Sequence, residues 1–149
     1  MPETCEGFLP AASITDALDE TWYDSGEPVG PATELPGPSA RAAAEEAATA
    51  LSCRWWPESA TEGYLLGYAF LLDDSTRDGL IDALGSASTY EAITIVGADA
   101  GFFTSEVRGD LRHSTVYAFV GDVWIALVGP LFEETLVNFA EEAIAGVAA

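Results

Sequence analysis

Basic side chains are scarce in this chain of 149 residues, which has no lysine, five arginines and a single histidine against 25 aspartates and glutamates. The formal net charge is −20 at pH 7. Proteins that bind nucleic acid or anionic membrane surfaces depend on clustered lysine and arginine side chains. The composition therefore excludes nucleic acid as an expected partner, and it excludes electrostatic attachment to a lipid surface.

Long apolar runs are also missing. The two longest are Tyr64–Leu72 and Val116–Val128, the second interrupted by Gly121 and Asp122. Both fall short of the roughly 20 apolar residues that a spanning helix requires. The sequence up to Pro10 has neither the basic start nor the apolar stretch of a signal peptide. We therefore expect membrane tethering only through a lipid anchor upstream of this chain, where a signal sequence would also lie.

The apolar content that is present is enough for one core. Hydrophobic residues make up 49% of the chain and aromatic residues 11%, well above the composition of disordered proteins. A chain of this length forms one domain of ordinary size. We expect a single domain over residues 1–149, with a glycine- and proline-rich surface loop over residues 24–38.

Helix caps, helical period and β-branched runs predict the secondary structure. The predicted helices cover about residues 13–22, 39–51, 75–84 and 131–147, and the predicted strands cover 52–56, 64–72, 92–96, 115–120 and 123–128. The clearest turn signal is Gly121-Asp122, because a two-residue connection of this kind closes a tight antiparallel hairpin. Consecutive strands with short turns favour an α+β fold, in which helices pack mainly on one face of an antiparallel or mixed sheet.

The chain has two cysteines, Cys5 and Cys53, and they do not form a C-x-x-C motif. A metal site is disfavoured because there are no further thiols and only one histidine. A structural disulfide is the preferred interpretation, and two free thiols are the alternative. A disulfide indicates an oxidising compartment, so we expect an extracellular or cell-envelope location. The rival setting is a salt-adapted cytoplasm, which also suits an acidic composition without lysine.

The surroundings of the two cysteines are similar to those of a known class of proteins. The segments Cys5–Ile14 (CEGFLPAASI) and Ser52–Trp55 (SCRW) resemble secreted actinobacterial lipoproteins of unknown function. In such domains a cysteine, a Leu-Pro step and a short helix precede a second cysteine beside a tryptophan at the head of a strand. The resemblance implies an envelope-exposed domain, and it carries over no catalytic residue.

No residue pattern points to catalysis, a metal or a cofactor. His113 is the only imidazole, and we expect it on the surface at the start of a hairpin strand. The segment Gly85–Ser88 does not match the G-x-S-x-G nucleophile elbow. The acidic segment Asp73–Gly79 has Arg77 where a calcium loop needs an oxygen ligand, so a helix cap explains it better. We therefore assign no catalytic residue, no metal ligand and no cofactor.

Aromatic side chains offer the candidate contact surface. Alternation along Tyr64–Leu72 places Tyr64 and Tyr68 on one face, a pattern typical of a core that also occurs in the wall of a ligand groove. For Phe102 and Phe103 we expect one buried ring and one exposed ring. The candidate residues for ligand or partner contact are Trp55, Trp56, Tyr64, Tyr68, Phe102 and Phe103.

The sequence favours an extracytoplasmic, non-enzymatic binding or interaction domain whose partner is an unknown protein or a small apolar ligand. Two alternatives remain open. One is a small acidic enzyme of a salt-adapted cytoplasm, in which His113 would work with a carboxylate or a serine. The other is an acidic inhibitor that mimics a polyanion. A mimic needs carboxylates along one face, whereas acidic pairs such as Glu45-Glu46 and Glu133-Glu134 are scattered along the chain.

Overall fold

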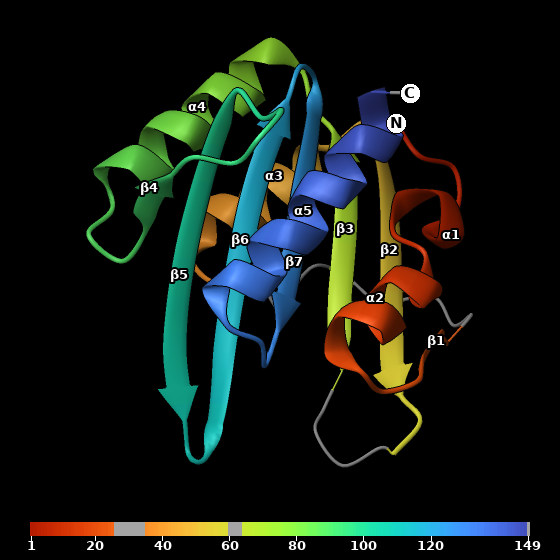
Figure 1. Cartoon of the computed structure of the whole chain (residues 1–149). Helices are drawn as coiled ribbons and strands as arrows, with labels where there is room; N and C mark the ends of the chain where they lie inside the picture. The colour runs from red at the N-terminus through yellow and green to blue at the C-terminus, as the bar shows by residue number, and fades with distance from the viewer. Residues whose placement is uncertain (26–34, 60–63, 149) are drawn as a thin grey trace.

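The chain is organised around an antiparallel sheet in the computed structural model, which describes residues 1–25, 35–59 and 64–148. Figure 1 shows this sheet with helices in front of it and behind it. Within the described residues the strand order is β1-β2-β3-β7-β6-β5-β4, and all neighbours are antiparallel. The strands are β1 (Trp22–Asp24), β2 (Thr49–Pro57), β3 (Leu65–Leu71), β4 (Glu91–Ile93), β5 (Ala100–Arg108), β6 (Leu111–Val120) and β7 (Val123–Gly129). The helices are α1 (Cys5–Phe8), α2 (Ala11–Leu18), α3 (Pro38–Glu46), α4 (Asp74–Ser86) and α5 (Glu133–Ala148). This confirms the predicted α+β single-domain fold with an antiparallel sheet.

The two central strands, β3 and β7, pair with each other and are buried on both faces. A strand with one solvated face alternates apolar and polar residues. The sequences of these two strands, LLGYAFL and VWIALVG, show no such alternation. Their composition therefore requires a covering layer on each side of the sheet.

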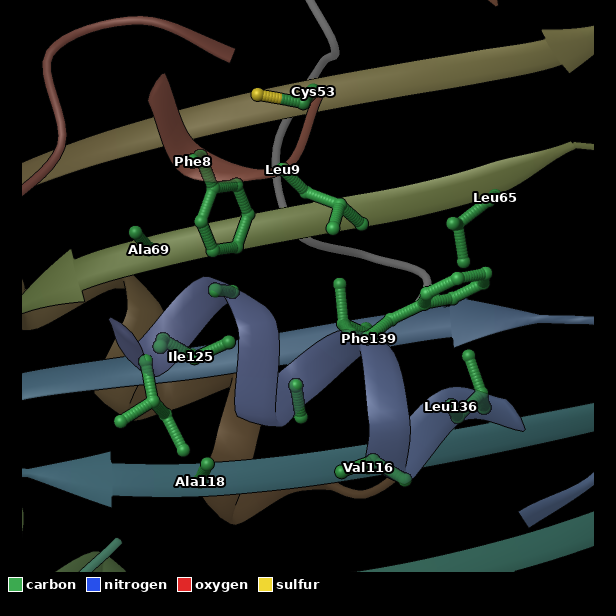
Figure 2. Close-up of a cluster of buried hydrophobic side chains, with 14 of the residues drawn as sticks. Phe8, Leu9, Cys53, Leu65, Ala69, Val116, Ala118, Ile125, Leu136 and Phe139 are labelled. Carbon is green, nitrogen blue, oxygen red and sulfur yellow. The ribbon is translucent and has the colours of Figure 1, made fainter. Parts of the chain in front are cut away.

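Helices α1, α2 and α5 supply the layer on one face. Helix α5 lies across the middle of the sheet, and Figure 2 shows its Leu136 and Phe139 side by side with Val116 of β6 and Ile125 of β7. At the other side of this cluster, the ring of Phe8 in α1 lies 6.2 Å from the ring of Trp55 in β2, centroid to centroid. The N-terminal segment and the C-terminal helix therefore pack on the same face of the sheet.

Helices α3 and α4 supply the layer on the opposite face. Ala40 and Ala43 of α3 and Leu80 and Leu84 of α4 are buried against an aromatic set from the sheet, made of Tyr68, Phe70, Tyr117, Phe119 and Trp124. Helices thus cover both faces, whereas the sequence analysis placed them mainly on one. The reason lies in β3 and β7, which carry apolar side chains on both faces of the sheet. Each of these faces needs its own layer of helices.

Two tight turns build the β5–β6–β7 meander. Gly121-Asp122 joins β6 to β7 as predicted, with Val120 paired to Val123. A second two-residue turn, Gly109-Asp110, joins β5 to β6. The φ angles of the two glycines are +56° and +64°, which suits glycine as the first residue of such turns. This second hairpin is not among the predicted elements.

The first predicted helix is wrong at both ends. It begins at Ala11 and ends at Leu18, because Asp19 adopts the left-handed conformation with φ 53°. Pro10 is the N-cap, and Ser13 lies inside the first turn, where its hydroxyl donates a hydrogen bond to the Glu142 carboxylate of α5. Helix α2 is thereby attached to the last helix of the chain.

The second predicted helix is too long. Helix α3 ends at Glu46, and the segment Thr49–Leu51 belongs to β2, where it pairs with β3. The predicted loop over residues 24–38 lies largely in residues 26–34, which are outside the described residues. Among the helices of the described chain, none is long and apolar enough to cross a membrane.

Candidate functional site

Cys5 and Cys53 form the predicted disulfide. Their Sγ atoms are 2.05 Å apart and their Cα atoms 5.7 Å apart. The bond joins α1 to the middle of β2 over a sequence separation of 48 residues, and Cys53 is buried beside Phe8 and Leu9 (Figure 2). The cysteine pair therefore holds the N-terminal segment on the sheet.

Three of the six candidate aromatic contacts are core residues. Trp55 and Tyr68 are fully buried, and Phe102 is 5% exposed. Trp55 lies in the cluster beneath α1, α2 and α5, and the other two lie in the cluster beneath α3 and α4. This corrects the predicted contact surface, because side chains at this depth pack the core and cannot meet a partner.

Trp56 and Tyr64 lie on the opposite side of β2 from Trp55 and are half-buried. Their rings meet edge to face with centroids 4.7 Å apart. The guanidinium carbon of Arg54 lies 4.9 Å from the centroid of Tyr64 and 5.9 Å from that of Trp56. The protein's own cation thus occupies these ring faces, and the cluster stabilises the end of β2 rather than offering an open aromatic surface.

Phe103 is half-buried and packs at the margin of the cluster beneath α5. Successive residues of a strand point to opposite faces, so Phe102 and Phe103 serve different layers of the fold. As expected, one of the two rings, that of Phe102, is buried, but Phe103 is half-buried where an exposed ring was expected.

The described chain has a pocket of about 390 Å³ at the end of the sheet formed by the β5–β6 hairpin. Its sheet wall consists of Thr104, Ser105 and Glu106 from β5, His113 and Thr115 from β6, and Val128 from β7. Its outer wall consists of Pro36, Gly37, Thr89 and Tyr90. The pocket lies on the α3 and α4 side, because Val128 belongs to the cluster on that face.

Tyr90 connects the two walls. Its hydroxyl donates a hydrogen bond to the main-chain oxygen of Pro36 at 2.6 Å and lies 3.4 Å from the hydroxyl of Tyr117 in β6. The two rings stack with centroids 5.6 Å apart. Burial raises the pKa of both phenols above the ordinary value of 10.0, so both remain neutral donors and acceptors at physiological pH.

Two cross-strand pairs supply the polar groups of the sheet wall. Thr104 lies directly opposite Thr115, and Glu106 directly opposite His113. Side chains at such positions have Cβ atoms about 4.5–5.5 Å apart, so the wall presents two hydroxyls beside a carboxylate and an imidazole. This set can bind hydroxyl, amide or ammonium groups of a ligand.

Ion pairs and metal-binding clusters of the described residues do not involve the pocket. Both ion pairs found in the described parts of the chain join Arg77 to an aspartate. Within the same residues no group of three or more His, Cys, Asp or Glu side chains is arranged to hold a metal ion.

His113 is the one pocket residue that the sequence singles out, and the sequence predicts it on the surface. The other lining residues are threonines, a serine, a glutamate, a valine and loop residues, which have no motif in common. One local signal could have located the hairpin, because Gly109-Asp110 has the same form as the Gly121-Asp122 turn. No sequence pattern indicates that the segments around Pro36 and Tyr90 lie close to this hairpin.

No family model, curated protein or solved structure matches this chain.

Proposed function

We propose that this protein is a non-enzymatic binding domain of the cell envelope or the extracellular space, and that the pocket at the β5–β6 hairpin is its binding site. The pocket carries this proposal. It is a concave site of about 390 Å³, within the usual range for small ligands. Convergent polar groups on its sheet wall and the Tyr90 hydroxyl at its outer wall can fix the orientation of a ligand.

The polar groups of the lining favour a ligand with hydrogen-bonding groups over the purely apolar one expected from the aromatic residues, and Pro36, Tyr90 and Val128 add apolar surface beside them. Hydroxyls, an imidazole and a carboxylate face the pocket, and the apolar contribution of the sheet is limited to Val128. The net charge of −20 raises the local concentration of cations and repels anions. A neutral or cationic ligand with hydrogen-bonding groups fits these conditions.

We prefer binding to catalysis because of the hydrogen bonds that His113 would need as a general base. A general base acts through a hydrogen bond to the group that it deprotonates, and a second group usually orients it. Glu106 lies across the strand pair from His113, which is the one arrangement here that favours an enzyme as second candidate. Nevertheless, no hydroxyl of the pocket is hydrogen-bonded to the imidazole among the bonds of residues 1–25, 35–59 and 64–148.

The disulfide supports the proposed compartment. Disulfides persist in oxidising environments and are rare in the cytosol of most organisms, so the Cys5–Cys53 bond supports an extracytoplasmic location. Alkylation of the protein in lysates of its native host, before and after reduction, tests this part of the proposal. Thiols that are blocked until reduction support it, and two thiols that alkylate at once would place the protein in a reducing compartment.

The binding proposal is tested by filling the pocket. Thermal-shift and NMR titrations with neutral sugars, amino sugars, amino acid amides and polyamines would be run on the wild type and on Thr104→Trp, which places an indole in the pocket. Thr49→Trp is the matched control, since Thr49 is an exposed threonine on β2, distant from the pocket in the strand order. We expect a saturable ligand for the wild type and for Thr49→Trp, with affinity reduced at least about tenfold in Thr104→Trp. If no probe binds, or if Thr104→Trp binds as well as wild type, the pocket is not the site.

A further inference from the structure

Strand β5 is only partly covered at the edge of the sheet. Strand β4 pairs with Gly101, Phe102 and Phe103 of β5 and no further. Strand β5 continues to Arg108 and pairs with β6 along its full length. In the described chain, therefore, the second half of β5 has a neighbouring strand on one side only, as the long strands at the edge in Figure 1 illustrate.

The pattern of the ladder indicates which backbone groups face the open side. In antiparallel pairs, residues whose N–H and C=O groups bond to the partner strand alternate with residues whose groups point away from it. A two-residue turn begins with a bonded pair, here Arg108 with Leu111. The N–H and C=O groups of Ser105 and Val107 therefore point outward, away from β6. Both residues are exposed, and 66% of Val107 is accessible.

The open edge runs along the mouth of the pocket. Continuation of the β4–β5 register would place Tyr90 opposite Thr104, but the chain turns there, and the Tyr90 hydroxyl reaches Pro36 instead. The space beside Ser105 and Glu106 is thus bounded by this turn and opens into the pocket. A strand that continued from this point would place every second side chain on the pocket side of the sheet.

We propose that this edge accepts an extended peptide segment of a partner protein as an additional strand beside β5, with a basic side chain of the peptide inserted into the pocket next to Glu106. This inference rests on the proposed binding function and assigns it a ligand class. Backbone bonds to Ser105 and Val107 would supply affinity, and the side chain between them would supply specificity, as in other cases of strand addition.

Charge complementarity decides the occupant. The residue that pairs with Glu106 lies between the two that bond to Ser105 and Val107, and its side chain points to the pocket side. A lysine or arginine at this position meets a carboxylate on a protein of net charge −20. A second copy of this chain is disfavoured, because antiparallel pairing of two such edges centred on Glu106 brings two glutamates together and adds the repulsion of two acidic chains.

At the other end of the sheet, the outer side of β2 is covered along much of its length. There the N–H of Ser25 donates to the oxygen of Arg54 at 3.0 Å, which extends the cover that β1 gives to β2. Further along β2, the Sγ of Cys5 lies 3.7 Å from the oxygen of Ser52. The disulfide and α1 thus occupy the position that a peptide would need on that side.

The test uses the blocked peptide acetyl-Thr-Val-Lys-Val-Thr-amide, titrated into the full chain at low salt and followed by NMR and calorimetry. N-methylation of both valines removes the N–H groups that would bond to Ser105 and Val107, and we expect affinity to fall at least about tenfold. N-methylation of the lysine is the matched control, because its N–H points away from β5, and we expect a change of less than about threefold. Replacement of the lysine by glutamate should abolish binding.

Variants of the protein test the same contact from the other side. Val107→Pro removes an outward N–H without breaking the ladder to β6, and it should weaken the peptide as strongly as N-methylation of the valines. Val107→Thr keeps the N–H and should bind as wild type. If Val107→Pro fails to fold, the N-methylated peptides on the wild-type protein decide the question.

The outcomes separate the two proposals. If small polar probes bind in a manner sensitive to Thr104→Trp but the peptide does not bind, or binds equally with methylated valines, strand addition is refuted and the pocket remains a small-molecule site. If neither peptide nor probe binds, the proposed function itself fails. Sedimentation that shows a dimer lost in Val107→Pro would assign the edge to a second copy and refute the peptide.

Discussion

The hydroxyl of Tyr90 lies 2.6 Å from the main-chain oxygen of Pro36, although the two residues are 54 positions apart in the sequence. This bond fixes the segment before α3 to the segment before β4, and the pocket lies between these segments and the sheet. The Tyr90 hydroxyl therefore helps to hold the outer wall of the candidate site in place.

Tyr90→Phe tests this dependence. The substitution removes one hydrogen bond and leaves the Pro36 oxygen without that donor, so we expect the free energy of unfolding to fall by about 1 kcal/mol. Binding of any pocket ligand should weaken as well, because the outer wall is no longer held. Denaturant titration measures the stability, and Tyr23→Phe, at an exposed tyrosine of β1, is the control with an expected change below about 0.5 kcal/mol. Equal losses in both variants would contradict the role of the Tyr90 hydroxyl.

Alkaline pH should destabilise the fold through Tyr117. This phenol is buried, and its burial together with neighbouring Tyr90 raises its pKa above the ordinary value of 10.0. The unfolded chain releases this proton near pH 10 whereas the folded chain retains it, so stability is complete below pH 10 and declines as the pH rises beyond it. Ultraviolet absorbance of tyrosinate, compared between wild type and Tyr117→Phe, measures the effect. A wild-type protein in which all five tyrosines ionise together near pH 10 without unfolding would disprove it.

Gly67 of β3 is a position where no side chain fits. A Cβ built there would lie 2.6 Å from Cζ3 of Trp55 and 2.9 Å from a ring carbon of Phe8. Gly67→Ala should therefore lower the free energy of unfolding by about 1–3 kcal/mol, the usual cost of overpacking a core. Gly79→Ala in α4 is the matched control, because nothing lies within 4 Å of its Cβ position and alanine favours a helix by about 0.5–1 kcal/mol over glycine. Opposite signs are expected in thermal and denaturant unfolding, and destabilisation by both would refute the steric argument.

The elements that could be predicted from the sequence are those with a local signal. Strand β3 has an unbroken apolar run, and the β6–β7 hairpin has Gly121-Asp122 between two apolar segments. Strand β5 was missed because its second half, Thr104–Arg108, extends past the core. Its Ser105, Glu106 and Val107 are exposed, so burial imposes no alternation on that part of the sequence.

Other features depend on contacts that are distant in the sequence. The run Ala47–Leu51 suits a helix as well as a strand, and the pairing with β3 decides it, as the hydrogen bond from the Ala48 N–H to the Leu71 oxygen at 2.9 Å shows. The pocket combines residues near positions 36, 90, 105 and 114. Periodicity describes one element at a time. It shows which aromatic side chains share a face of a strand, but it does not show whether that face is covered by the core or open to a partner.

The disulfide should provide a large part of the stability of the N-terminal segment. Cys5 and Cys53 close a long loop, and loop-closure entropy predicts that its removal lowers the free energy of unfolding by up to about 4 kcal/mol. The double variant Cys5→Ala with Cys53→Ala, compared with the oxidised and reduced wild type in urea, measures this contribution. Reduction should bring the wild type to the stability of the double variant and leave that variant unchanged. Because α1 covers Trp55, near-ultraviolet dichroism should change at the same time, and a reduced protein as stable as the oxidised one would show that packing alone holds α1 on the sheet.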